Sequence, residues 1–260
     1  MEKPTTSGYA NVNGLNMYYE TYGNGNIPLV LIHGGGSTIQ SSFGNIIPLL
    51  AGYGKLVAME LQAHGRTSDR NAPESFEQDA DDVAALLNYL KIEKANFLGF
   101  SNGGTTTLQV AIKHPSIVNK IIVISGGYKR EGFIPGFFDG MQNATLDNMP
   151  ALLKTAYLEV APDKDKLQVM FEKDRQRMID FKDMSDTDLQ SIKAPALIMV
   201  ADNDVVTTEH NLKISKLIPG AQLVVLPGVH GAFLGEIITV KKGSRLPAVT
   251  ATLAMEFLAG

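Results

Sequence analysis

Cysteine is absent from the 260-residue chain, so disulfide bonds, thiol nucleophiles and zinc–thiolate sites are excluded. A strong excess of one charge is also missing. The formal net charge is −4, and no Lys/Arg cluster is larger than the pair Lys241 and Lys242. This balance gives no signal for binding a polyanion, so we expect no nucleic-acid partner.

Long hydrophobic runs are missing as well. Apolar runs such as residues 29–32 and 121–124 have the length of strands and are far too short to span a bilayer. Residues 1–6 contain no apolar segment of the kind found in a signal peptide, so we expect a cytoplasmic protein, with a removed signal sequence as the alternative. A hydrophobic content of 44% with 19% charged residues is ordinary for a globular protein.

Strand-like and helix-like segments alternate along most of the chain, which favours a doubly wound α/β fold. The central strand-like runs are continuously apolar, the pattern of parallel strands buried on both faces. The predicted strands are residues 17–22, 29–33, 55–61, 95–101, 120–125, 196–201 and 222–226, and the predicted helices are residues 75–90, 105–113, 209–217 and 246–258.

One segment interrupts this alternation. Residues 132–188 contain no clear strand but many Phe and Met residues. Because an insertion after the carboxyl end of a strand projects over the side where α/β folds bind ligands, we expect a helical cap rather than extra core. The predicted domains are therefore a core of residues 1–131 and 189–260 and a cap of residues 132–188.

The pattern Gly-x-Ser-x-Gly at residues 99–103 lies between a strand-like and a helix-like run. This context is typical of a nucleophile elbow, where a tight turn exposes the hydroxyl of Ser101 and requires small residues at Gly99 and Gly103. A plain glycine-rich turn is one alternative. A dinucleotide fingerprint is another, because Gly99-x-Ser101-x-x-Gly104 has its spacing, but serine replaces the glycine that lets pyrophosphate approach.

A serine nucleophile needs a base and an acid that orients the base. His230 directly follows the last predicted strand, so it is the candidate base. Asp204 follows another strand end and is the preferred acid, with Asp202 as the alternative. The order Ser, Asp, His along the chain fits this arrangement. The other histidines are expected to be structural (His33 and His64), to cap a helix (His114) or to be solvated at a helix start (His210).

Two backbone N–H groups are needed to bind a developing oxyanion. Asn102, directly after the serine, supplies one. Gly35, in the glycine run after an early strand, is the preferred second donor, and Gly34 is the alternative. A phosphate-binding loop would need a Lys-Ser/Thr pair that this glycine run lacks.

Together these motifs resemble the α/β-hydrolase superfamily over essentially the whole chain. The matching segments are His33-Gly34-Gly35-Gly36, Ala63-His64-Gly65-Arg66-Thr67-Ser68, the elbow at 99–103 and Gly228-Val229-His230. The resemblance implies an α/β-hydrolase fold, with a mostly parallel central sheet, helices on both faces and a small helical cap inserted before the sixth-to-seventh strand region. It also implies Ser101 as nucleophile, Asp204 as acid, His230 as base, and Gly35 and Asn102 as oxyanion donors.

Departures from the family pattern are few. Glu60 and Ala63 stand where relatives usually carry Asp and Gly, which we expect to alter a structural turn only. Asn102 stands where many relatives carry Met or Gln, and its side chain could tune the pocket. A serine at position 101, rather than an aspartate, argues against the haloalkane dehalogenase and epoxide hydrolase branches.

The sequence thus predicts a serine hydrolase for a small-molecule ester or lactone with an apolar acyl group. It needs neither a metal nor an organic cofactor. Hydrolysis of a carbon–carbon bond, perhydrolysis and a weakly catalytic receptor remain alternatives on the same residues. The expected substrate-pocket residues are Gly34, Phe100, Phe133, Phe137, Phe138 and Met141.

Overall fold

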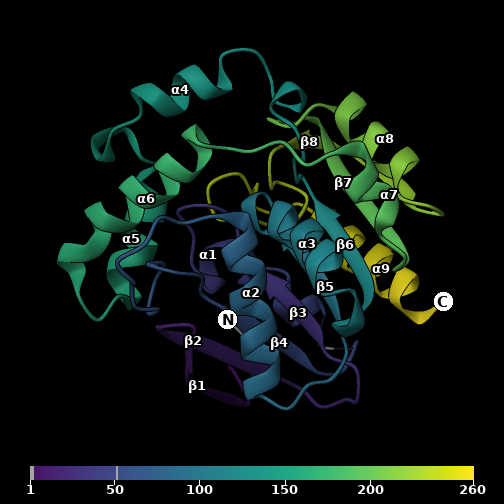
Figure 1. Cartoon of the computed structure of the whole chain (residues 1–260), viewed down its shortest axis with the longest axis horizontal. Helices are drawn as coiled ribbons and strands as arrows, with labels where there is room; N and C mark the ends of the chain where they lie inside the picture. Colours follow the sequence, from purple (N-terminus) through teal and green to yellow (C-terminus); the bar gives the residue numbers. More distant parts are fainter. Residues whose placement is uncertain (1–2, 51) are drawn as a thin grey trace.

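An eight-stranded sheet runs through the computed structural model, which describes residues 3–50 and 52–260. The strand order is β1-β2-β4-β3-β5-β6-β7-β8 (Figure 1). β2 is antiparallel to both β1 and β4, and the remaining pairs are parallel, so the predicted mostly parallel sheet is confirmed. The strands are β1 (Thr6–Val12), β2 (Leu15–Tyr22), β3 (Leu29–Ile32), β4 (Leu56–Met59), β5 (Ala95–Phe100), β6 (Val118–Ile124), β7 (Ala196–Asn203) and β8 (Gln222–Val229).

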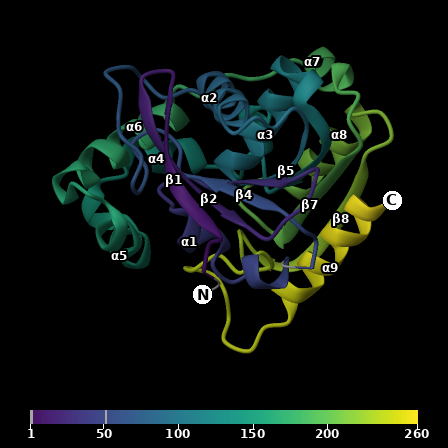
Figure 2. The same ribbon diagram turned by 90° about the horizontal axis from the view of Figure 1, so that it is seen from below.

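Helices cover both faces of the sheet (Figure 2). α2, α3 and α8 pack on one face and α1 and α9 on the other, each through its apolar side chains. Every residue of β3, β4 and β5 is consequently buried, which explains their continuously apolar sequences. These helices are α1 (Ile39–Phe43), α2 (Phe76–Tyr89), α3 (Asn102–Lys113), α8 (Thr208–Leu217) and α9 (Leu246–Ala259).

The segment between β6 and β7 is helical. α4 (Phe137–Asn143), α5 (Ala151–Val160) and α6 (Leu167–Ile179) stand away from the sheet, at the upper left of Figure 1, whereas α7 (Asp186–Ser191) returns to α3 and α8. An apolar cluster of its own holds α5 and α6 together and packs on Ala63 in the turn after β4. Short 3₁₀ turns complete the chain at Ile47–Leu49, Pro115–Ile117, Arg130–Gly132, Leu146–Asn148 and Lys164–Lys166.

Among residues 3–50 and 52–260, no helix has both the length and the apolar character needed to cross a membrane. The expectation of no signal peptide rests on residues 1–6. Residues 1 and 2 lie outside the described residues.

Apart from His230, three histidines are buried and accept a backbone N–H: His33, His64 and His210. His33 Nε2 accepts the Leu61 N–H at 3.0 Å and His64 Nε2 accepts the Gly36 N–H at 3.2 Å, so both rings hold loops as expected. His210 was expected to be solvated, and that prediction is wrong. Its ring is buried and accepts the Tyr128 N–H at 3.1 Å. His114 is the C-cap residue of α3.

Candidate active site

Ser101 occupies a strained turn between β5 and α3. Its φ of 56° lies in the left-handed region, which costs free energy for a residue with a Cβ and is typical of a nucleophile elbow. The turn is tight on both sides. A Cβ on Gly99 would lie 2.0 Å from the Gly103 carbonyl oxygen, and one on Gly103 would lie 2.0 Å from that of Ile32. The two glycines therefore allow the turn that exposes the Ser101 hydroxyl.

Loops after β7 and β8 bring an aspartate and a histidine to this serine. His230 Nε2 lies 3.0 Å from Ser101 Oγ, and His230 Nδ1 lies 2.6 Å from Asp204 Oδ1. The Phe100 ring packs against the imidazole with 4.9 Å between ring centroids. The structure therefore brings together the three residues predicted to carry the chemistry.

Asp204 is held as an ionised acceptor. Its Oδ2 accepts the Ser125 hydroxyl at 2.6 Å and the Ala201 N–H at 3.3 Å. Burial opposes ionisation, but His230 and these donors together hold the pKa of Asp204 below its usual value. The alternative residue, Asp202, is exposed and instead accepts the Gly228 N–H at 2.8 Å.

The glycine loop after β3 lies beside the elbow. Gly34 N–H donates to Ser42 Oγ at 3.3 Å, and His64 accepts the Gly36 N–H, so the loop is fixed on both sides of Gly35. Asn102 is the first residue of α3, where a backbone N–H has no partner within the helix. A Cβ on Gly35 would lie 2.5 Å from the Asn102 side-chain nitrogen, so a larger residue there would require this side chain to shift.

A cavity of about 210 Å³ lies over these groups. Of the predicted pocket residues, Phe133, Phe137 and Met141 line it. The other three are not among its lining residues. A Cβ on Gly34 would lie 3.2 Å from Phe100 and Ser101 side-chain atoms, and Phe100 itself packs against the His230 ring. Phe138 packs into an aromatic cluster with Phe133 and Phe181. The full lining is Gly35, Ser101, Asn102, Thr105, Ser125, Gly127, Phe133, Phe137, Met141, Asp174, Met178, Val205 and His230.

Sequence reasoning missed Asp174, a carboxylate from α6 that enters this cavity. Its Oδ1 accepts the Asn102 side-chain N–H at 3.1 Å and pairs with Arg177. Arg177 is buried and also pairs with Asp79 of α2 at 2.6 Å. The spacing of Asp174 and Arg177 on one helix turn was visible in the sequence, but such a pair ordinarily marks a solvated helix face.

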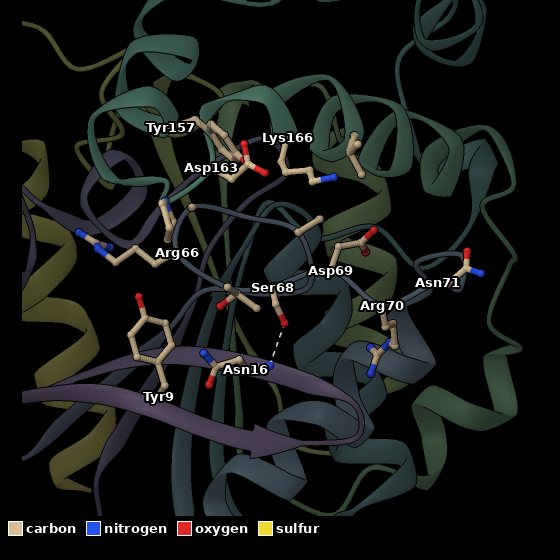
Figure 3. Close-up of a pocket in the computed structure, with 15 residues that line it drawn as sticks. Tyr9, Asn16, Arg66, Ser68, Asp69, Arg70, Asn71, Tyr157, Asp163 and Lys166 are labelled. Carbon is tan, nitrogen blue, oxygen red and sulfur yellow. Dashed lines mark hydrogen bonds between the residues drawn. The ribbon is translucent and has the colours of Figure 1, made fainter.

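A larger cavity, of about 710 Å³, lies elsewhere and shares none of these residues. Figure 3 shows it between the β1–β2 hairpin, the turn at residues 65–71, and Tyr157, Asp163 and Lys166 above that turn. Two of its cations are engaged within the protein, because Arg66 pairs with Glu60 and Arg70 with Asp82. These two side chains are therefore less available to a ligand than the groups around Ser101.

Within the described part of the chain, no group of three or more His, Asp or Glu side chains is arranged to hold a metal ion. That the protein needs no cofactor stays a prediction from the sequence.

The family model described as alpha/beta hydrolase fold matches residues 27–157, just over half of the sequence. The chain belongs to this family. The serine hydrolase BPHL of Homo sapiens is 34% identical over 125 residues, covering 45% of this chain and 42% of that protein. The 2-hydroxy-6-oxo-2,4-heptadienoate hydrolase of Pseudomonas putida is 25% identical over 236 residues, covering 82% of this chain and 84% of that protein.

Among solved structures, the enol-lactonase from Burkholderia xenovorans LB400 matches with a TM-score of 0.75 and 22% identity, covering 97% of this chain and all of that one. This likeness confirms the predicted α/β-hydrolase fold. The chain spans about half the length of several curated relatives, between 40% and 60%. Both curated relatives described above are named as hydrolases.

Proposed function

We propose that the protein is a serine hydrolase that cleaves a carboxylic ester or lactone through an acyl-enzyme on Ser101. The observation that carries this proposal is the chain of contacts from Ser101 Oγ through the His230 ring to Asp204, at 3.0 and 2.6 Å. These lengths suit a nucleophile, a base and an orienting acid.

The reaction follows from this geometry. His230 Nε2 takes the proton of Ser101 as Oγ attacks the carbonyl carbon, and the N–H groups of Gly35 and Asn102 stabilise the oxyanion. Collapse of the tetrahedral intermediate breaks the bond to the leaving alcohol, which takes the proton from His230. Water, deprotonated by the same ring, then attacks the acyl-enzyme and releases the acid.

Residues 132–188 act in this proposal as a cap over the reacting groups. Phe137 and Met141 of α4 and Met178 of α6 face the cavity, so the acyl group would contact apolar side chains. A volume of about 210 Å³ suits a small to medium acyl group.

Labelling with a fluorophosphonate probe tests the proposal without knowledge of the substrate. We expect the wild type and the matched control Ser191→Ala, an exposed serine on α7, to be labelled and Ser101→Ala to be unlabelled. Labelling that persists in Ser101→Ala would overturn the assignment of the nucleophile. A folded wild type that resists the probe would favour the receptor alternative.

Carbon–carbon bond hydrolysis is the second candidate, favoured by the similarity to the Pseudomonas putida dienoate hydrolase. Once Ser101 is labelled, turnover of a 2-hydroxy-6-oxo-dienoate that exceeds turnover of simple esters and lactones would select it.

A further inference from the structure

Both apolar and polar side chains line the cavity at Ser101. Phe133, Phe137, Met141, Met178 and Val205 form its apolar walls. Asp174 and His230 are the lining residues with a titratable side chain, and His230 is already engaged by Ser101 and Asp204. Asp174 is therefore the charged group left to meet a substrate.

The two oxygens of Asp174 have different surroundings. Oδ1 is occupied, since it accepts from Asn102 and pairs with Arg177. Oδ2 lies over Gly35, 2.5 Å from where a Cβ on that residue would stand, and the side chain keeps 16% of its surface exposed. Asp174 thus lines the cavity, with this acceptor oxygen close to Gly35, one of the two proposed oxyanion donors.

The carboxylate carries a negative charge at this position. Burial opposes its ionisation, but the Arg177 guanidinium holds the pKa of Asp174 below its usual value. A negative charge close to the oxyanion position disfavours a second negative charge there. A cationic substrate group between the two would turn this repulsion into attraction.

We propose that Asp174 is a specificity-determining residue, which selects esters whose acyl part carries an ammonium or other hydrogen-bond-donating group next to the carbonyl carbon. This inference rests on the proposed function at Ser101. The apolar walls would hold the rest of the acyl group, so the preferred acids combine an apolar side chain with a donor one or two bonds from the reacting carbon. Anionic acyl groups would be rejected.

Four ethyl esters of nearly equal shape test this on the wild type alone. They are the ethyl esters of alanine, lactate and isobutyrate and the monoethyl ester of methylmalonate. In each, the carbon next to the carbonyl carries a methyl group and one group that varies. That group is an ammonium in the alanine ester, a hydroxyl in the lactate ester, a second methyl in the isobutyrate ester and a carboxylate in the methylmalonate ester. We expect kcat/KM to fall in that order, with the alanine ester roughly 10- to 100-fold above the isobutyrate ester. An isobutyrate ester cleaved as well as the alanine ester would overturn the proposal.

The variant Asp174→Asn tests the residue. It should lower the alanine-to-isobutyrate ratio about 10-fold or more relative to the wild type, leaving the intrinsic reactivity difference of the two esters, and raise turnover of the methylmalonate half-ester. The matched control Asp165→Asn removes the same charge from an exposed position in residues 132–188 and should leave the ratio unchanged. A ratio that survives in Asp174→Asn would overturn the assignment to this residue.

Fluorophosphonate labelling separates the two proposals. If Ser101 reacts with the probe in the wild type but the ester series shows no preference, the serine hydrolase stands and the role of Asp174 fails. If the wild type is unlabelled, the proposed function itself fails. Labelling of Asp174→Asn at or above the wild-type rate would show that its reacting groups are intact.

Discussion

At the scale of single residues, the two aspartates after β7 differ in their contacts. Asp204 lies 2.6 Å from His230 Nδ1, whereas Asp202 holds the Gly228 N–H. We expect Asp204→Asn to lower kcat by about 10³- to 10⁴-fold, because an amide can donate to Nδ1 and so favour the wrong tautomer of the ring. Asp202→Asn should stay within a few-fold of wild type. Steady-state kinetics on one ester compares them, and the reverse ranking would make Asp202 the acid.

The elbow glycines give a second prediction at this scale. In Gly103→Ala the new methyl group would meet the rigid carbonyl of Ile32 at 2.0 Å, so we expect the free energy of unfolding to fall by about 3 kcal/mol or more. Gly140 of α4 is the matched control, since a Cβ there meets nothing within 4 Å. Gly140→Ala should raise stability by about 0.5–1 kcal/mol through helix propensity. Urea denaturation measures both changes, and a stable Gly103→Ala would contradict the tight turn.

Glu60, which stands where relatives usually carry Asp, is accommodated by contacts within its own turn. Its buried carboxylate accepts the Arg66 N–H at 2.6 Å and pairs with the Arg66 side chain at 2.7 Å. Its carboxylate also fills the space at Gly65, where a Cβ would lie 2.4 Å away. The longer side chain thus has a structural role in the turn.

At the scale of elements, burial decided which strands the sequence could predict. β3 to β7 were found because most of their residues are buried and apolar, and the runs are continuous. β1 was missed, since only Ala10 and Val12 among its seven residues are buried. α1 was also missed, because its five residues depend on a reciprocal cap between Thr38 and Ser41 rather than on periodicity.

The residues of the candidate site also divide into those that the sequence could place and one that it could not. Ser101, Asp204 and His230 directly follow strand ends, so the sheet topology alone places them at one edge. Asp174 lies on α6, and its position depends on how that helix packs against the core. No periodicity in the sequence gives that packing, so the carboxylate in the cavity could be found only from the structure.

Arg177 connects α6 to the core and gives a prediction for this element. It is buried, pairs with Asp174 and Asp79, and lies 3.7 Å from Glu74. Burial raises the pKa of Asp79 to about 6, although Arg177 opposes the rise. We expect Arg177→Met to lower the free energy of unfolding by about 3–5 kcal/mol at pH 7, because it leaves buried carboxylates without their cation.

Lys182, exposed just after α6, is the matched control for the loss of a cation. Lys182→Met should change stability by less than about 0.5 kcal/mol. Equal stability of the two variants in urea denaturation would show that the Arg177 cluster does not hold α6 to the core.

At the scale of the whole molecule, buried neutral histidines make stability depend on pH. Burial lowers the pKa of His33 to about 3 and that of His210 to about 4, and both rings accept a backbone N–H at Nε2. Between about pH 6.5 and 4 the unfolded chain takes up protons that the folded one refuses, so these groups lower stability as the pH falls. Asp79, with its raised pKa, acts in the opposite direction over much of this range.

A difference measurement isolates His210 from these opposing groups. Glutamine at this position can still accept the Tyr128 N–H but cannot take up a proton. Relative to His210→Gln, the wild type should therefore lose about 3 kcal/mol of unfolding free energy between pH 7 and pH 4. Urea denaturation of both proteins across this range measures the difference. A difference that does not change with pH would mean that His210 titrates alike in the folded and unfolded chain, contrary to its burial against Tyr128.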